Sequence, residues 1–198
     1  MDSSQSLLFD PTPAESNETL DELNAELLQR AKVMPQYAER IFVFGTGKQG
    51  AKVAVVGESP GPPDIDSGQP FMGPAGQMLD RILAAVNLKR EDCYLTNVAK
   101  MISTGDELTP DVINFFVPYL HRELAIIRPR VVIAFGNTPT RALLRTKKPI
   151  SQMRGEFHDY GNAKLMPTFN PAYLLRDPTK KREVWEDMKK VRAFLSSI

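Results

Sequence analysis

The sequence contains very little cysteine and histidine. Cys93 is the only cysteine among 198 residues, so one chain can form neither an internal disulfide nor a metal or iron-sulfur site built from several cysteines. We expect Cys93 to be a small core residue at the start of a strand. The two histidines, His121 and His158, are too few for the three or four ligands that a metal site requires. The sequence therefore predicts no metal centre.

Long hydrophobic runs are also absent. No apolar stretch approaches the roughly 20 residues that cross a bilayer, and the N-terminus does not have the basic and apolar segments of a secretory signal. Hydrophobic residues make up 42% of the chain and charged residues 25%, which is typical of a soluble globular protein. We expect a monomeric cytoplasmic protein without membrane contacts, and a length of 198 residues suits one domain.

Basic residues are missing from the first 29 positions, which carry seven acids and no Lys or Arg. From residue 141 onward there are thirteen Lys and Arg against six Asp and Glu. A polyanion would therefore meet the C-terminal third first, because basic side chains supply most non-specific affinity for nucleic acids. Residues 1–18 are polar and lack periodicity, so we expect a flexible acidic arm before a single domain at 19–198.

Apolar runs alternate with helical patterns along the rest of the chain. Strands are expected at 52–57, 93–98, 131–136 and 164–169, and helices at 20–34, 76–88, 109–127, 137–144 and 180–195. Thr109 is predicted to cap the third helix, which Pro118 should kink or divide. The helix at 137–144 should start by the same combination of cap and proline. This order predicts an α/β fold, a three-layer α/β/α arrangement around a central four-stranded, mainly parallel sheet.

Ligands of such sheets bind at the carboxyl ends of the strands. Four segments reach that edge: GESPG after the first strand, Asn97 at the end of the second, GNTP after the third and NPAYLLR after the fourth. The segment 57–80 is dense in glycine and proline, which is typical of a loop that shapes a pocket. It lacks the Gly-Lys-Ser/Thr of a phosphate-binding loop, so a Walker-type site is disfavoured.

Eight segments between Arg30 and Phe194 resemble one enzyme family in the same order. They are VFGTG, VVGESPG, GQPFMGPAGQMLD, YLTNVAK, IRPRVVIAFG, ISQMRGEFH, MPTFNPAYLLR and KREVWEDM. Together they resemble the iron-sulfur type, or family 4, of the uracil-DNA glycosylase superfamily. The resemblance implies an enzyme that hydrolyses the N-glycosidic bond of uracil in DNA, on an extrahelical base, and leaves an abasic site.

The resemblance implies a uracil-binding pocket made by Gly57, Phe71, Asn97 and Asn170. Phe71 matches the aromatic residue that stacks on uracil, with a core phenylalanine as the alternative. Asn97 matches the asparagine that reads the edge of the base, and its amide can both donate and accept hydrogen bonds. A turn-capping asparagine is the alternative.

Three residues match catalytic positions of the family. Glu58 and Asp64 could orient the attacking water or stabilise the sugar cation, although a glutamate beside loop N–H groups could instead brace the loop. Ser59 stands where other members of the superfamily carry a water-activating aspartate, so strong base catalysis is not expected. Asn170 replaces the family's histidine that donates to the uracil oxygen, and its amide can still donate there.

DNA contacts and cofactor positions also follow from the resemblance. Leu174 matches the apolar wedge that enters the DNA stack, with core packing as the alternative, and Arg176 could hold a neighbouring phosphate. His158 could lie near the site. The four cysteines of the family's cluster fall on Arg30, Val33, Met101 and Phe116. We therefore expect no iron-sulfur cluster, with apolar side chains filling its volume.

The sequence thus favours a uracil-DNA glycosylase acting on DNA that contains uracil or a related lesion. Ser59 and Asn170 depart from the strongest catalytic residues, which leaves two alternatives open. One is a lesion-binding protein of the same fold with weak or no turnover. The other is a glycosylase for another deaminated or mismatched base.

Overall fold

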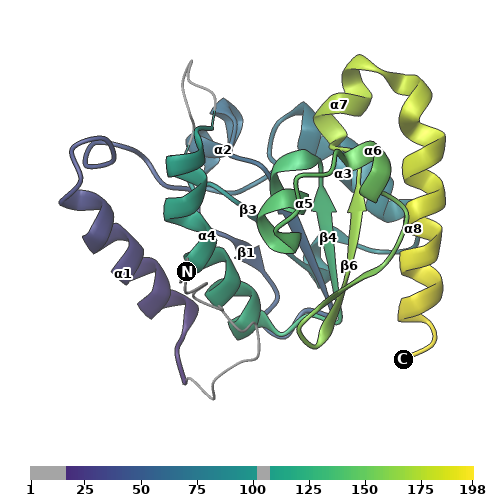
Figure 1. Ribbon diagram of the computed structural model, residues 1–198, viewed down its shortest axis with the longest axis horizontal. Coiled ribbons are helices and arrows are strands. Elements are labelled where there is room, and N and C mark those ends of the chain that lie inside the picture. The colour runs from purple at the N-terminus through teal and green to yellow at the C-terminus, as the bar shows by residue number, and fades with distance from the viewer. Residues whose placement is uncertain (1–16, 102–107) are drawn as a thin grey trace, which may run out of the picture.

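The computed structural model describes residues 17–101 and 108–198, and it forms a six-stranded sheet with helices on both faces (Figure 1). The strand order is β1-β3-β2-β4-β6-β5. The strands are β1 (Thr46–Gly47), β2 (Val53–Gly57), β3 (Cys93–Asn97), β4 (Val131–Phe135), β5 (His158–Tyr160) and β6 (Ala163–Thr168). The four inner strands are parallel, whereas β1 and β5 pair antiparallel at the two edges.

The expected three-layer fold with a mainly parallel sheet is confirmed, but the sheet is larger than the four strands predicted. All four predicted strands form. The two missed strands have two and three residues, too few to show an apolar alternation in the sequence.

One face of the sheet is covered by α3 (Pro74–Ala84) and α8 (Lys181–Leu195), and the other by α4 (Pro110–Ile127) and α5 (Asn137–Leu144). Alternate residues of each inner strand point to opposite faces. In β2, Val53 and Val55 join the cluster under α3 and α8, while Ala54 and Val56 face α4. Both faces are buried, as is usual in parallel sheets.

A further helix, α1 (Leu20–Lys32), packs on the outer side of α4 (Figure 1). Thr19 caps it by accepting from the backbone N–H of Glu22, whose carboxylate accepts from the Thr19 N–H. Arg122 of α4 pairs with Glu18 and with Glu26. The predicted arm, residues 1–18, lies outside the described residues except for its last two positions. Glu18, at the end of that arm, is held by the ion pair with Arg122.

Several local predictions are refined by the structure. Thr109 caps α4 by accepting from the Val112 N–H at 3.3 Å, as expected, but α4 runs unbroken through Pro118, so the helix is not divided. Gly136, rather than the predicted Asn-Thr-Pro segment, is the N-cap of α5. The Asn137 side chain instead accepts from the backbone N–H of Ile150 at 2.8 Å.

Three short α-helices and two single 3-10 turns complete the fold, and none was predicted as such. They are α2 (Pro62–Ser67), α6 (Ile150–Met153), α7 (Pro171–Arg176) and the single 3-10 turns at Arg90–Asp92 and Pro178–Lys180.

Cys93 begins β3 and is fully buried, as expected, and burial raises the pKa of its thiol to about 11. No helix in the described ranges combines the length and apolarity needed to cross a bilayer.

Candidate active site

The predicted site residues converge at the carboxyl edge of the parallel sheet. Asn97 ends β3, Gly57 ends β2, Gly136 follows β4 and Asn170 follows β6. Because these four strands are neighbours in the order β3-β2-β4-β6, their ends form one continuous row. The topology therefore brings together residues that are far apart in the sequence, at the edge where open α/β sheets bind ligands.

Gly57 lets an aromatic ring and an amide meet over the end of β2. It pairs with Asn97 in the parallel ladder. A Cβ atom at position 57 would lie 2.3 Å from Asn97 Oδ1 and 2.6 Å from Phe71 Cζ, closer than any real Cβ contact. Asn97 is 3% exposed, whereas Phe71 is only partly buried. The three residues therefore form a compact corner with one flat apolar surface and one polar edge.

The Phe71 ring is held by a strained and heavily braced backbone. Phe71 has a φ of 61°, in the left-handed region that bulky residues rarely adopt. The Arg90 guanidinium donates to the Phe71 carbonyl oxygen at 2.5 Å and to that of Pro70 at 3.3 Å. Its Nε donates to Asp80 at 2.7 Å. Arg90 was not identified from the sequence, because its partners lie ten to twenty residues away.

Asp64 is placed to brace the loop that carries Phe71. Its carboxylate is buried and accepts from two backbone donors, the Gly61 N–H at 3.0 Å and the Met72 N–H at 2.6 Å. These bonds fix the start of α2 to the segment that carries Phe71. Asp64 thus braces the loop through both of its oxygens, and its catalytic role stays a prediction.

Glu58 lies at the mouth of the site, with its side chain exposed. The Thr138 hydroxyl donates to Glu58 Oε2 at 2.5 Å, while the Glu58 backbone oxygen accepts from the Ala99 N–H at 3.0 Å. The partner of the carboxylate is thus the first turn of α5, where Thr138 was not singled out from the sequence. Glu58 retains one oxygen that can hydrogen-bond water or a sugar.

Asn170 is the N-cap of α7, and this fixes which side of its amide faces outward. Its Oδ1 accepts from the Ala172 N–H at 2.8 Å. Across residues 17–101 and 108–198, Nδ2 has no hydrogen-bond partner. A Cβ atom at Gly136, whose φ is 100°, would lie 3.3 Å from Asn170 Cβ and 3.6 Å from Nδ2. The capping bond therefore leaves Asn170 with a free donor at the carboxyl edge of the sheet.

Comparison with known proteins identifies the family of this chain. Residues 44–189 match the family model described as the uracil DNA glycosylase superfamily. The chain belongs to the uracil-DNA glycosylase superfamily.

Curated relatives match over most of their length. The type-4 uracil-DNA glycosylase of Thermotoga maritima is 33% identical over 186 residues, covering 91% of this chain and 97% of that protein. The protein of the same name from Archaeoglobus fulgidus is 31% identical, covering 88% and 92%. That from Saccharolobus solfataricus is 34% identical, covering 78% and 76%.

The leucine assigned as a DNA wedge is buried in this superfamily member. Leu174 is 1% exposed and packs with α3 and α8, which fits the core-packing alternative and leaves its side chain turned away from solvent in this conformation. The motif spacing could not show which face of α7 turns inward. Its neighbour Leu175 is 44% exposed, and Arg176 is exposed as expected.

The positions that correspond to the family's cluster ligands do not fit an iron-sulfur cluster. Met101 and Phe116 are buried in the aromatic cluster between α1 and α4, as expected for side chains that fill space. Val33 is 80% exposed, so for this residue the expectation is wrong. The Arg30 guanidinium lies 5.7 Å from the centre of the Phe115 ring. None of these four side chains supplies the thiolate that such clusters require.

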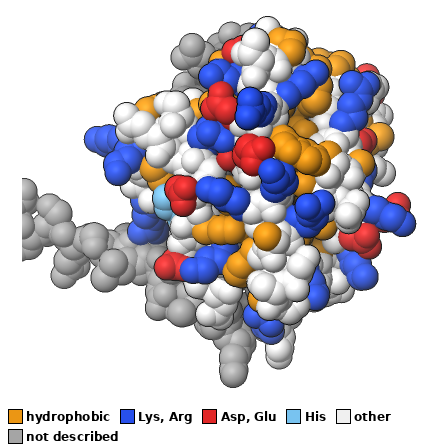
Figure 2. Space-filling view, turned by 90° about the vertical axis from the view of Figure 1, so that its right-hand side faces the viewer, with side chains coloured by type: hydrophobic (Ala, Val, Ile, Leu, Met, Phe, Trp, Pro, Cys, Tyr) orange, Lys and Arg blue, Asp and Glu red, His pale blue; other side chains and the backbone are white. Residues whose placement is uncertain are grey.

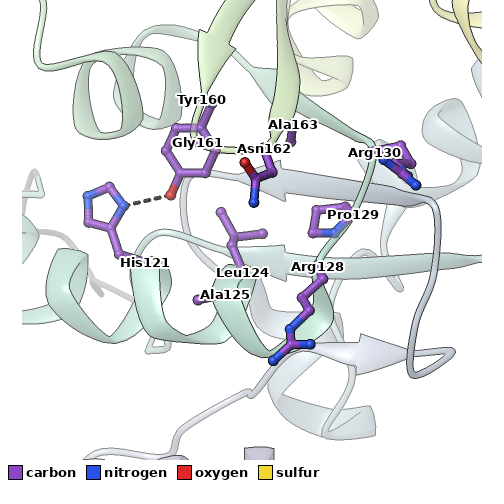
Figure 3. A pocket seen from close by; sticks show the side chains of 10 residues that line it. All are labelled: His121, Leu124, Ala125, Arg128, Pro129, Arg130, Tyr160, Gly161, Asn162 and Ala163. Atoms are coloured by element: carbon purple, nitrogen blue, oxygen red, sulfur yellow. Dashed lines mark hydrogen bonds between the residues drawn. The ribbon is translucent and has the colours of Figure 1, made fainter. Parts of the chain in front are cut away.

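The histidines are not part of the row of candidate residues at the carboxyl edge of the sheet. His158 Nε2 contacts the Met153 carbonyl oxygen at 3.4 Å, and no contact brings it to Asn97 or Asn170. His121 lines a cavity of about 290 Å³ at the amino ends of β4 and β6, the opposite edge of the sheet (Figure 3). Within the described ranges, no group of three or more His, Cys, Asp or Glu is placed to hold a metal ion.

The face that carries α8 is rich in basic side chains. Figure 2 shows Lys and Arg spread across this surface with apolar side chains between them. Its exposed basic residues include Arg176, Lys181, Arg182, Lys190 and Arg192. This surface adjoins α7, which begins directly after Asn170, so it extends from the site along the C-terminal helix.

Proposed function

We propose that this protein is a DNA glycosylase that hydrolyses the N-glycosidic bond of uracil in DNA and leaves an abasic site. The observation that carries the proposal is the corner formed by Gly57, Phe71 and Asn97, where a ring and an amide meet over a strand end that has no side chain. The similarity to type-4 uracil-DNA glycosylases over most of the chain supports it.

In this proposal, uracil leaves the DNA stack and enters the corner. Phe71 stacks on the face of the base, an interaction worth about 1–3 kcal/mol for an aromatic side chain. Asn97 reads the polar edge, where its amide donates to a carbonyl oxygen and accepts from the imide N–H. Since cytosine presents a different donor and acceptor pattern, an amide fixed in one orientation discriminates between the two bases.

Asn170 stabilises the departing uracil. Its Oδ1 is engaged by the Ala172 N–H, which leaves Nδ2 to donate to the uracil oxygen as negative charge develops. A donor placed in advance at such an oxygen is worth about 100- to 1000-fold in rate in other enzymes. The sequence departs from the family histidine here, but the capped helix keeps a donor aimed outward.

Glu58 is the remaining acid for the hydrolytic step. Its exposed carboxylate, oriented by Thr138, would hold the attacking water or stabilise the positive charge that develops on the sugar. Ser59 is no general base, so most of the rate is proposed to come from binding and from stabilisation of the leaving group.

We further propose that the protein works without an iron-sulfur cluster, as a monomer, on DNA in the cytoplasm. Aromatic rings fill the space beside α4 where the family's ligands would lie. Tyr37, in the segment after α1, stacks on Phe115 of α4 with ring centres 4.6 Å apart, and Phe115 meets its neighbour Phe116 edge-on at 5.0 Å. Iron and sulfide analysis of protein expressed with added iron should find neither. A stoichiometric cluster would overturn this part of the proposal.

The proposed contacts with DNA centre on α7. Leu175 is the exposed apolar side chain closest in sequence to the buried Leu174, so we assign the wedge to Leu175, with Arg176 on a flanking phosphate. The described part of residues 19–198 forms the catalytic domain, and residues 1–16 are proposed to be a separate acidic arm.

The test is to incubate the purified protein with end-labelled DNA that contains one uracil and then cleave abasic sites with alkali. We expect a single cleavage product at the uracil and none in a control DNA with thymine at that position. Tight binding without cleavage would instead support a lesion-binding protein, and cleavage only at other mismatched bases would support a glycosylase of different specificity.

A further inference from the structure

A buried ion pair lies behind the end of β3. Lys100 and Glu123 have side chains that are each 2% exposed, and Lys100 Nζ lies 2.5 Å from Glu123 Oε2. Lys100 follows β3 and Glu123 comes from the C-terminal half of α4. Burial alone lowers the pKa of Lys100, and the adjacent Glu123 carboxylate opposes that shift. No role in binding or catalysis has so far been given to either residue.

Every polar atom of this pair is engaged. Besides Glu123, Lys100 Nζ donates to the Thr96 hydroxyl at 2.5 Å and to the backbone oxygen of Asn97 at 2.8 Å. Glu123 accepts from the Tyr94 hydroxyl at 2.6 Å and from the Thr96 hydroxyl at 3.0 Å. A Cβ atom at Gly45 would lie 2.3 Å from Glu123 Oε1, so glycine leaves room for the carboxylate.

Stability alone does not account for such an arrangement. Removing two charges from water is costly, and replacing a buried ion pair with apolar residues of similar size is often neutral or stabilising. Here the two charges fix the orientation of the groups that they contact. Three residues of β3, Tyr94, Thr96 and Asn97, are tied to α4 through one carboxylate and one ammonium group.

The hydrogen bonds of this ion pair extend to Asn97, the residue at the site. On one side, the chain after Asn97 bonds to β2, with the Val98 N–H donating to the Gly57 oxygen at 2.9 Å and the Ala99 N–H to the Glu58 oxygen at 3.0 Å. On the other side, the Asn97 carbonyl oxygen accepts from Lys100. The peptide that carries the Asn97 side chain is thus fixed from both sides.

We propose that Lys100 and Glu123 are positioning residues that hold Asn97 in the orientation needed to read the base. This inference rests on the proposed uracil-binding role of Asn97. The ammonium group fixes the Asn97 peptide, the carboxylate fixes the ammonium group, and the Asn97 amide then meets the base edge without reorganising. Loss of the charges should weaken recognition of the base but not binding of the DNA backbone.

The test compares affinities for two DNA duplexes, one carrying 2′-fluoro-deoxyuridine, which resists hydrolysis, and one carrying a tetrahydrofuran abasic analogue. The double variant Lys100→Met/Glu123→Gln removes both charges while keeping an acceptor for Tyr94 and Thr96. We expect its preference for the uracil duplex over the abasic duplex to fall about tenfold, the loss of a hydrogen bond to a charged group. Affinity for the abasic duplex should remain that of the parent.

Two matched controls separate positioning from folding stability. Tyr94→Phe removes a bond to Glu123 but leaves Lys100 on Asn97, and Val191→Ala removes buried volume in α8, away from β3. Both should lower the melting temperature while keeping the preference for uracil. The Lys100→Gln/Glu123→Gln variant provides a second test of the same change if the first variant is poorly folded.

Failure of the positioning role can be distinguished from failure of the proposed function. If Asn97→Ala retains the preference for uracil, then Asn97 does not read the base and the proposed function of this pocket fails. If Asn97→Ala loses that preference while the double variants keep it, only the positioning role is overturned. An equal loss in Tyr94→Phe, or failure of both double variants to fold, would also overturn it, because the pair would then serve folding alone.

Discussion

Asn170 combines two roles in one side chain, and this makes it more than a weaker substitute for histidine. Its oxygen caps α7 and its nitrogen faces the site. A histidine at this position would offer a different donor but a poorer cap, at a cost of about 1 kcal/mol. Local stability and catalysis are therefore coupled at this residue.

We expect Asn170→Ala to lower the single-turnover rate of uracil excision by about 100- to 1000-fold, the cost of losing one such donor. Asn170→His should raise the rate above that of the parent while lowering the melting temperature, because the cap is weakened. Both are measured on one uracil-containing duplex. If histidine lowers the rate as alanine does, the pocket is built around the asparagine, and if neither matters Asn170 is no part of the site.

His121 provides a pH-dependent contribution to stability. Burial, reinforced by the charge of Arg145, lowers the pKa of His121 from 6.5 to about 4, and a hydrogen bond of 2.6 Å joins its Nδ1 to the Tyr160 hydroxyl. Between pH 6.5 and 4 the unfolded chain binds a proton at this residue and the folded chain does not. Stability should therefore fall as the pH drops through this window, by at most about 1.4 kcal/mol for each pH unit.

Chemical denaturation of the parent and of His121→Gln across this range measures the effect. The free energy of unfolding of the variant should change less steeply with pH, because glutamine does not titrate. Parallel curves for the two proteins would show that His121 ionises equally in both states.

At the scale of elements, the braced segment from α2 to α3 is the main device that builds the site. Asp64 and Arg90 fix its backbone from two sides. These hydrogen bonds offset the conformational cost of the left-handed backbone at Phe71. The segment is thus preorganised before DNA binds, which avoids an ordering cost at the moment of binding.

Asp64→Asn tests whether this acid is a brace or a catalyst. The amide can accept only one of the two backbone N–H groups, so we expect weaker binding of uracil-containing DNA and a lower melting temperature. The pH dependence of the excision rate should stay unchanged, because no catalytic group is removed. A pH profile that loses its acidic limb in Asp64→Asn would return Asp64 to a catalytic role.

Sequence patterns predicted the inner strands and the edge of the sheet at which the candidate residues meet, because both depend on local signals. Apolar runs that end in glycine or asparagine located the strand ends, and the topology rule for parallel sheets brought Gly57, Asn97 and Asn170 together. Edge strands of two and three residues carry no such signal. The burial of Leu174 and the partners of Asp64 and Arg90 depend on contacts between separate segments, which motif spacing does not encode.

Charge separation dominates at the scale of the whole molecule. The first 29 residues are acidic, and the C-terminal third is basic. Basic residues that contact phosphates make the affinity for DNA salt-dependent. Each contact contributes about −0.9 to the slope of the logarithm of the association constant against the logarithm of the salt concentration. An acidic arm competes for the same surface if it can reach it.

Deleting residues 1–16, which retains Glu18 and the Thr19 cap, should leave folding intact and raise DNA affinity at low salt. The gain should shrink above about 0.1 M salt, where charges are screened beyond roughly 10 Å. The matched control keeps the full length and neutralises the arm by Asp2→Asn, Asp10→Asn and Glu15→Gln. If deletion and neutralisation both leave the affinity unchanged, the arm does not shield the basic surface.

The proposed function depends on a pocket at the carboxyl edge of the sheet that reads uracil through Asn97. The most direct measurement is single-turnover excision from two duplexes that differ only in carrying uracil or cytosine, with the parent and with Asn97→Ala. We expect the parent to release uracil and not cytosine, and Asn97→Ala to lose about 1–3 kcal/mol of transition-state stabilisation for uracil, roughly 5- to 160-fold in rate. Equal excision of uracil by the parent and the variant would contradict it.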